Sequence, residues 1–266
     1  MKFGDAVLKN KYLDAAETRK WFSPASQTSS SGTLIGRPWE IFRAQNVTVD
    51  GRLIEIYTKG GDIRTYHSIM AFIPDYDLVV AILLSGAGTS GFDVLAIFSK
   101  LVQTLLPGIE HAGKSESEIA YGGTYTDKAS NSTITLNLDD SPGFDISPWV
   151  VRGVDVLRTS QGIDLPPVPF PPPPIDAPAR FRLYPMRAVS DSQTSWRMVA
   201  ASGTAEEVAG FEASFFWPMA TCITWGGLDR FTNMLQSQDH FVFAVEDGKA
   251  TEVELVGYGI VLTREG

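Results

Sequence analysis

The residue types that could do chemistry in this sequence gather in one short stretch that holds Lys59, Tyr66 and His67. A lysine ammonium can bind an anion or an enol oxygen, and a tyrosine hydroxyl can donate a hydrogen bond to a carbonyl. A histidine can give or take a proton near neutral pH. Together they predict a catalytic site that polarises a carbonyl and moves a proton. The alternative for the same residues is a solvated turn lysine and a structural histidine at the start of a strand.

Aromatic side chains form the second candidate group, as walls of an apolar substrate pocket. Phe215, Phe216 and Trp217 are consecutive, and neighbours in a strand point to opposite faces, so these three cannot all enter one core. The predicted substrate-binding residues are Trp39, Tyr57, Trp149, Phe216, Trp217 and Trp225. Packing in a core remains the better explanation for the isolated tryptophans.

Composition excludes several other functions. With three histidines and the single Cys222, the chain offers neither an internal disulfide nor a zinc ligand set, so we expect no metal and no cofactor. The formal charge of −9, with scattered Lys and Arg, argues against nucleic-acid binding. No uninterrupted apolar run approaches the roughly 20 residues of a membrane span. If Met1 is the natural start, the N-terminus predicts a cytoplasmic protein.

Elements that could position Lys59 and His67 follow from the hydrophobic pattern. Residues 1–22 predict two short helices, and a Ser/Thr/Gly-rich loop follows. Four strands separated by turn residues are expected at 39–44, 53–58, 68–73 and 78–84, which suits antiparallel pairing. A helix over 92–106 should then end at Pro107 and Gly108.

The second part of the sequence reads as a separate β domain. Residues 111–117 are polar and predict a linker, and short period-two segments follow from residue 118 onward. Asp247-Gly248 predicts a hairpin between the last two predicted strands, at 241–246 and 251–256. The proline-rich stretch 165–178 cannot join a ladder and predicts a polyproline excursion. The expected fold is α+β, with a small antiparallel sheet and helices over 1–110 and an all-β sandwich or barrel over 118–266.

Several short motifs carry a resemblance to a known family. In the first part they are FG (3–4), TRKW (18–21), GRPWEI (36–41), IYTKGGD (56–62), YHS (66–68) and IPDY (73–76). In their order and spacing they resemble fungal β-lactamase-like serine hydrolases, related to class C β-lactamases and penicillin-binding proteins. From YGGTY (121–125) onward, the sequence resembles the lipocalin-like domain appended in that fungal branch.

The resemblance also shows what this sequence lacks. The family uses Ser-x-x-Lys, a Tyr or Ser motif ending in Asn, and Lys-[Ser/Thr]-Gly on a strand. No lysine here has a serine three residues before it, and neither Tyr-x-Asn nor Ser-x-Asn precedes the Lys59 strand. The third element remains as Lys59-Gly60-Gly61, with Gly60 in place of the hydroxyl residue. We therefore expect no covalent acyl transfer from these 266 residues.

Three functions remain open. The first is a non-covalent biosynthetic cyclase or isomerase, such as a Diels–Alderase, acting on an apolar secondary-metabolite intermediate of the kind that the family implies. The second is a part of a β-lactamase-like serine hydrolase, and the third is a non-catalytic small-molecule binding protein. The helical lobe of the family is not among these residues, so one apolar face of the sheet would be exposed. We expect the N-terminal helices, the β domain, a ligand or a second copy in a homodimer to cover it.

Overall fold

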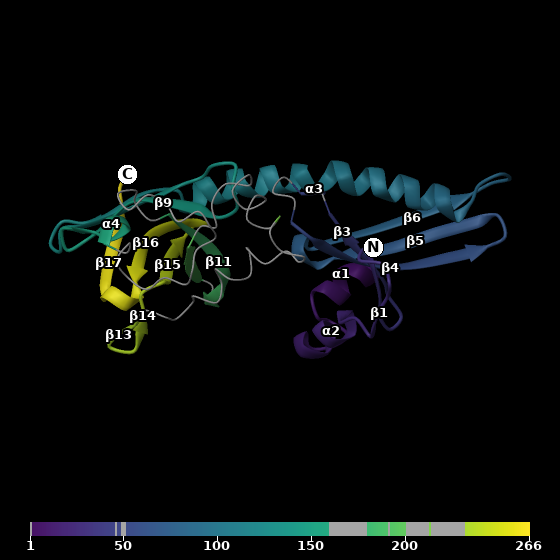
Figure 1. Ribbon diagram of the computed structural model, residues 1–266, viewed down its shortest axis with the longest axis horizontal. Coiled ribbons are helices and arrows are strands. Elements are labelled where there is room, and N and C mark those ends of the chain that lie inside the picture. The colour runs from purple at the N-terminus through teal and green to yellow at the C-terminus, as the bar shows by residue number, and fades with distance from the viewer. Residues whose placement is uncertain are drawn as a thin grey trace. The chain divides into compact units, whose positions relative to one another are not determined.

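The computed structural model describes residues 2–45, 47, 48, 52–159, 180–190, 192–200, 213 and 232–266 (Figure 1). They form two compact units, Met1–Gly113 and Lys114–Gly266. The predicted α+β class is confirmed, because the first unit combines helices with an antiparallel sheet and the second is a β barrel. The proline-rich segment 165–178 and the aromatic candidates Phe216, Trp217 and Trp225 lie outside the described residues.

The first unit is built on a six-stranded antiparallel sheet whose strands follow one another in chain order. The alternation predicted for 53–58 is present: Ile54, Ile56 and Thr58 are buried, and Glu55 and Tyr57 face the other side. The strands are β1 (Ser26–Gln27), β2 (Thr33–Ile35), β3 (Glu40–Ala44), β4 (Ile54–Ile63), β5 (Tyr66–Ile73) and β6 (Leu78–Ser85), with the 3-10 turn η1 (Pro74–Tyr76) before β6.

Helices cover both faces of this sheet. The predicted N-terminal helices are present as α1 (Lys2–Leu8) and α2 (Ala15–Phe22), and Phe22 packs on Phe72 of one sheet face. The opposite face packs against α3 (Gly91–Tyr121) through an apolar row at four-residue spacing, made of Val94, Phe98, Val102 and Leu106. The N-terminal helices therefore cover part of the sheet face opposite to α3.

Helix α3 corrects two expectations. It does not end at Pro107, and residues 111–117, expected as a linker, are helical. Proline at a helix interior costs about 3 kcal/mol because it removes one backbone hydrogen bond. Burial of Leu106 beside it and good helix formers such as Ala112 and Lys114 offset that cost. Among the described helices, α3 alone is long and apolar enough to span a membrane by length and composition, and its buried row is what a core-covering helix shows.

The second unit is a barrel of eight strands closed by the pairing of β8 with β9. The short α4 (Val156–Thr159) follows the side strand β10 (Val154–Asp155), and the strand pair β13 (Thr232–Asn233) and β14 (Gln236–Ser237) lies apart from the barrel sheet. The hairpin predicted at Asp247-Gly248 joins β15 to β16. In barrel order the strands are β9 (Phe144–Val151), β11 (Phe181–Ser190), β12 (Gln193–Ala200), β15 (His240–Glu246), β16 (Lys249–Leu255), β17 (Ile260–Arg264), β7 (Gly123–Asp127) and β8 (Ser132–Asn137). The 3-10 turn η3 (Val256–Tyr258) lies between β16 and β17.

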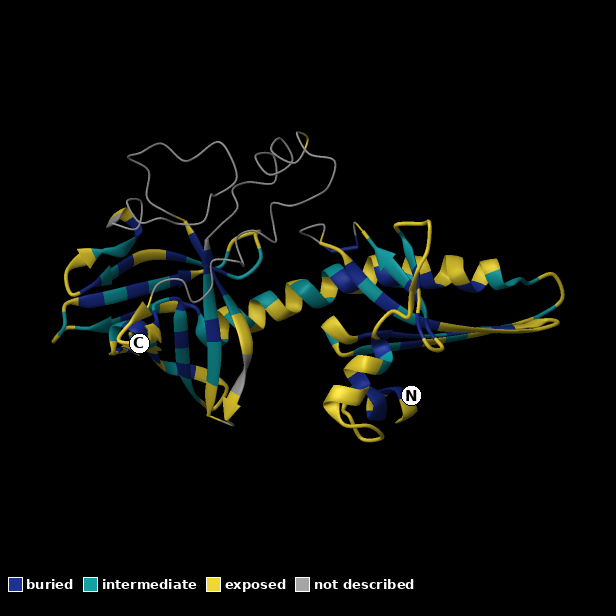
Figure 2. Ribbon diagram, turned by 60° about the horizontal axis from the view of Figure 1, so that its bottom comes forward, coloured by how far each residue is buried: buried dark blue, intermediate teal, exposed yellow. Residues whose placement is uncertain are grey.

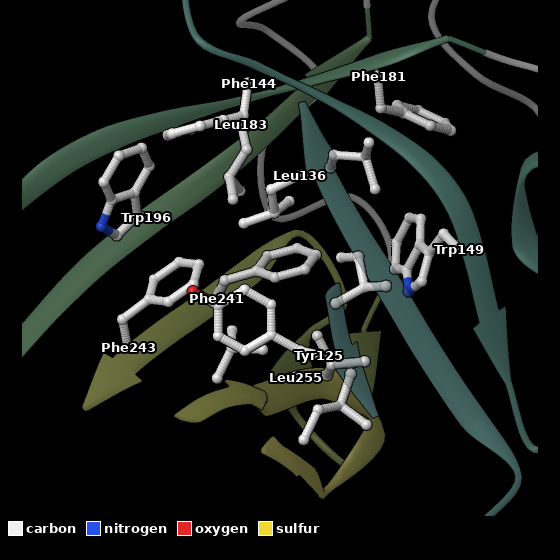
Figure 3. Packing of buried hydrophobic residues seen from close by; sticks show 14 of the residues in the cluster. Tyr125, Leu136, Phe144, Trp149, Phe181, Leu183, Trp196, Phe241, Phe243 and Leu255 are labelled. Atoms are coloured by element: carbon white, nitrogen blue, oxygen red, sulfur yellow. The ribbon is translucent and has the colours of Figure 1, made fainter. Parts of the chain in front are cut away.

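Large apolar side chains pack inside the barrel (Figure 3). Figure 2 shows the alternation of buried and exposed residues along these strands that sends every second side chain inward. Phe241, Phe243 and Trp149 are at most 1% exposed. The Phe243 ring meets Tyr125 and Trp196, and the Phe241 ring meets Trp149. The described part of the barrel therefore has a side-chain core in the place where a lipocalin-type barrel would hold a ligand.

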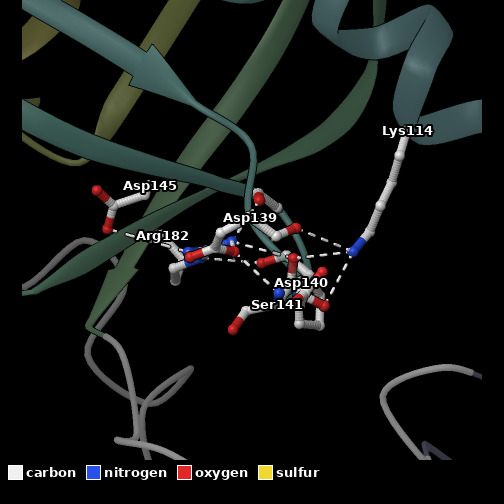
Figure 4. A network of polar contacts seen from close by, with 8 residues as sticks. Lys114, Asp139, Asp140, Ser141, Asp145 and Arg182 are labelled. Carbon is white, nitrogen blue, oxygen red and sulfur yellow. Dashed lines mark hydrogen bonds and ion pairs between the residues drawn. The ribbon is translucent and has the colours of Figure 1, made fainter.

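Two cations organise the loop between β8 and β9 (Figure 4). Arg182 is 3% exposed and forms a bidentate pair with Asp139, with both nitrogen–oxygen distances at 2.7 Å. Its guanidinium also donates to the carbonyls of Ser141, Pro142 and Gly143. Lys114 of α3 donates to the carbonyls of residues 139–141 at 3.0–3.3 Å. Each carbonyl from 139 to 143 thus accepts a hydrogen bond from one of these two side chains.

Candidate functional site

The candidate site lies where β4 continues past the beginning of β3. The last β3–β4 pair is Glu40 opposite Thr58, whereas Lys59 to Ile63 pair with β5 alone. Among the residues that the structure describes, no strand pairs with the other side of β4 from Lys59 onward, so this part of β4 is an edge strand. The Lys59-Gly60-Gly61 element begins at this point.

The ammonium of Lys59 forms an ion pair with Glu40. The second carboxylate oxygen of Glu40, Oε2, accepts a hydrogen bond from the backbone N–H of Gly60 at 3.2 Å. The side chains of Lys59 and Glu40 are about half exposed, at 48% and 43%. The cation and the strand N–H therefore already hold a carboxylate, one supplied by the protein itself.

His67 is held by two acceptors on the α3 face of the sheet. Its Nδ1 contacts the Asp62 carboxylate, and its Nε2 lies 3.0 Å from the carbonyl oxygen of Thr89, just before α3. The side chain is 8% exposed. An ideal Cβ on Gly91 would stand 3.0 Å from Asp62 Oδ2, so this carboxylate lies at the first residue of α3. Both ring nitrogens face protein oxygens, so neither is free to act on a ligand.

Tyr66 lies beside a hollow on the other face of the sheet. The hollow has a volume of about 280 Å³ and is lined by Gly61, Ile63, Tyr66, His67, Ser68, Leu83, Leu84 and Ser85. Ile63, Tyr66 and Leu83 are 73%, 66% and 86% exposed, and the outer ends of these strands are yellow in Figure 2. This end of the sheet face is not covered by α1 or α2, and it combines apolar side chains with a hydroxyl.

The remaining described candidates are packed into cores. Trp39 is 4% exposed and packs with Trp21 and Phe72, and Trp149 is enclosed in the barrel core. The Tyr57 hydroxyl donates to Glu55 Oε2 at 3.0 Å. Burial, and then the Glu55 carboxylate, raise the pKa of Tyr57, so the hydroxyl stays protonated.

The structure thus brings together only part of the predicted constellation. Neighbouring residues of a strand face opposite sides, and Lys59, paired with Met70, shares the Tyr66 face rather than the His67 face. Neither Glu40 nor Asp62 was identified from the sequence as a partner of these side chains, because the contacts of both residues depend on strand register. Among the described residues, no group of three or more His, Cys, Asp or Glu side chains could hold a metal ion.

Comparison with known proteins identifies the second unit. A family model described as beta-lactamase-like-like, C-terminal domain, matches residues 113–266, which is more than half of the chain. The chain belongs to this family. The resemblance stated from the sequence motifs is thereby confirmed, and the matched range covers the whole barrel together with the end of α3.

Relatives of this beta-lactamase-like chain come from fungi, and the chain matches only a part of each of them. A probable hydrolase from Phoma sp. is 30% identical over 145 residues, which is 53% of this chain and 24% of that protein. A beta-lactamase-like protein from Arthroderma benhamiae is 33% identical over 56% of this chain and 23% of its own length. One from Strobilurus tenacellus is 26% identical over 60% of this chain and 53% of its own length. The chain therefore spans about a quarter to a half of these relatives.

Among solved structures, an octameric penicillin-binding protein homologue from Pyrococcus abyssi aligns with 97% of this chain and 44% of its own. The TM-score is 0.29 and the sequence identity is 10%. This likeness is too slight to support any conclusion about the beta-lactamase-like chain.

Proposed function

We propose that this chain forms the strand-edge side of a β-lactamase-like acyl hydrolase site whose serine nucleophile comes from residues outside these 266. The observation that carries the proposal is the position of Lys59-Gly60-Gly61 on the part of β4 that pairs with β5 and extends past the last pair with β3. Backbone N–H groups on a strand edge can hold an acyl oxygen while a nucleophile attacks from outside the sheet, and the Lys59–Glu40 ion pair lies at this same edge. The length of the fungal relatives, including those called hydrolases, supports a contribution from further residues.

The test compares this chain with a longer polypeptide that contains it and a Ser-x-x-Lys. The 266-residue chain alone should not be labelled by a fluorophosphonate probe, whereas the longer protein should be labelled and should hydrolyse p-nitrophenyl esters. Lys59→Met in the longer protein should lower kcat/KM by about tenfold or more, which corresponds to about 1.4 kcal/mol of transition-state binding. Stable labelling of a serine within these 266 residues, or full activity of the Lys59→Met protein, would contradict the proposal.

A non-covalent cyclase or isomerase is the second candidate. It is supported by the absence of Ser-x-x-Lys from the sequence and by the apolar hollow beside the Tyr66 hydroxyl. Such an enzyme would hold a linear polyene or enone in the hollow and polarise its carbonyl with Tyr66. The expected result is conversion of the precursor to a cyclic isomer of equal mass, lost in Tyr66→Phe and kept in His67→Gln. A thermal shift with the precursor recovered unchanged would indicate a binding protein instead.

A further inference from the structure

We infer that Glu40 occupies the anion position of the strand edge and thereby restricts the site to neutral acyl substrates. The inference rests on the proposed hydrolase function for the choice of substrate class, and on the strand-edge geometry alone for the exclusion of carboxylates. A ligand carboxylate at this edge would require the Lys59 ammonium and the Gly60 N–H. Both are already bound to Glu40.

Both oxygens of the Glu40 carboxylate are used. One contacts the Lys59 ammonium, and the other accepts from the Gly60 N–H at 3.2 Å. This is the two-point arrangement with which a cation and a backbone N–H bind a carboxylate ligand. The Glu40 carboxylate therefore occupies the position that a ligand carboxylate would take beside the Lys59 ammonium and the Gly60 N–H.

The position of Glu40 is fixed by the sheet beneath it. Thr58 is fully buried, and its hydroxyl donates to the backbone carbonyl of Glu40 at 2.7 Å. The two residues face each other in the β3–β4 register. This contact holds the Glu40 backbone where its side chain reaches just past the last ladder pair, to Lys59 and Gly60. The arrangement is built into the strands and does not depend on a surface loop.

Gly60, next to the Glu40 carboxylate, departs from the family pattern. The Lys-[Ser/Thr]-Gly pattern has a hydroxyl here, and this chain has none. An ideal Cβ on Gly60 would stand 3.5 Å from Glu40 Oε2, an ordinary contact distance, so a Ser or Thr side chain would point toward the Glu40 carboxylate. The chain thus has a carboxylate beside residue 60, where the pattern has a hydroxyl, and this carboxylate makes the position anion-excluding.

Electrostatics gives the direction of the resulting specificity. An anionic substrate would place a second carboxylate beside Glu40 with a single ammonium between them, and like charges that close repel. A neutral ester or lactone has no charge to place there and meets no such repulsion. Selection by an introduced repulsive group is an established way to set specificity.

The experiment measures carboxylate binding directly, with benzoate as the probe and the Gly60 amide resonance as the reporter in the 266-residue chain. In the wild-type protein, benzoate should cause no saturable shift of the Gly60 amide. The same result is expected in the control Glu55→Ala, which removes a carboxylate from β4, the strand that contains Gly60. In Glu40→Ala, the Gly60 amide should shift and saturate, with affinity at least about tenfold tighter than in wild type, or about 1.4 kcal/mol. Adding Lys59→Met to Glu40→Ala should abolish the gain. If Glu40→Ala does not fold, Glu40→Gln removes the charge at nearly constant side-chain size. Its benzoate affinity should also be higher than that of the wild-type protein.

Each other outcome overturns the inference. Equal benzoate binding in wild type and Glu40→Ala would show that Glu40 excludes nothing, and no binding in either would show that the edge is not an anion position. Binding requires no nucleophile, so the result is independent of the proposed function. A longer protein without hydrolase activity, together with a benzoate gain in Glu40→Ala, would refute the proposed function and leave the exclusion of carboxylates intact.

Discussion

At the scale of single residues, Arg182 shows how a buried charge can be satisfied. A guanidinium presents five donors in one plane, and here they meet Asp139 and three backbone carbonyls. Burying this cation without partners would cost several kcal/mol. All of these partners belong to the short loop between β8 and β9. The Arg182 side chain therefore holds that loop in one conformation.

Replacing this arginine should destabilise the barrel. Arg182→Met leaves the carbonyls of Pro142 and Gly143 without this donor and removes the cation that pairs with Asp139. We expect a loss of about 3 kcal/mol in the free energy of unfolding. The half-exposed Asp139 keeps the loss near the lower end for buried pairs. Urea denaturation followed by tryptophan fluorescence measures it. Arg158→Met removes an exposed ion pair and should change stability by less than about 0.5 kcal/mol; equal losses in the two variants would contradict this account.

The same contact predicts a pH dependence. Partial burial acts to raise the pKa of Asp139, but hydrogen bonds from Arg182 and from the Ser141 N–H outweigh it and hold the pKa below 3.8. A carboxyl with a depressed pKa contributes stability above its unfolded pKa and loses that contribution as the pH falls through the folded value. The stability difference between wild type and Arg182→Met should therefore shrink as the pH falls below about 5 and through the lowered pKa of Asp139. A constant difference across that range would refute it.

The candidate site shows which residue-scale facts a sequence can supply. Lys59 and His67 could be chosen from the sequence by residue type, but strand register decides what each contacts. Asp62 is directly opposite His67 in the β4–β5 pair, and Glu40 is opposite Thr58. A shift of one residue would turn each side chain to the other face, so these partners could not be identified from spacing alone.

At the scale of elements, α3 and the strands differ in how well the sequence predicted them. The strands at 78–84 and 241–246 have the residues and bounding turns that their structure requires, and they are found within one residue of the expected limits. Helix α3 extends 15 residues beyond its predicted end at 106. Its C-terminal part is stabilised by distant partners: Arg264 donates to the carbonyls of Ile119, Ala120 and Gly122. Capping from the far end of the chain leaves no local signal.

Lys114 offers a direct test of how the end of α3 is held. Lys114→Met removes the donor to the carbonyls of 139–141 and should cost about 1 kcal/mol, because these carbonyls are near enough to water to be partly compensated. Faster hydrogen exchange in the peptide covering 139–143 should accompany the loss. Lys100→Met, at an exposed position on the same helix, is the matched control and should leave this exchange unchanged. Equal exchange in both variants would show that Lys114 does not order the loop.

At the scale of the whole molecule, each of the two units has buried apolar residues of its own. One core is formed by the sheet with α1, α2 and α3, and the other fills the barrel. The two units, Met1–Gly113 and Lys114–Gly266, each have the length of an independent domain, about 100–150 residues. The sequence indicated this division through the change from mixed helix and strand patterns to short strands alone.

Because each unit has its own core, we expect two unfolding transitions whose midpoint temperatures respond to different substitutions. Phe72 and Phe243 are both fully buried, one in each unit, and truncating a buried phenylalanine costs about 3–5 kcal/mol. In calorimetry, Phe72→Ala should lower one transition by roughly 10 °C or more and leave the other in place, and Phe243→Ala should do the reverse. Leu83→Ala, at a position 86% exposed, should shift neither, since surface substitutions stay within about 0.5 kcal/mol. A single transition that falls equally in both phenylalanine variants would mean that the two cores unfold as one cooperative body despite their separate packing.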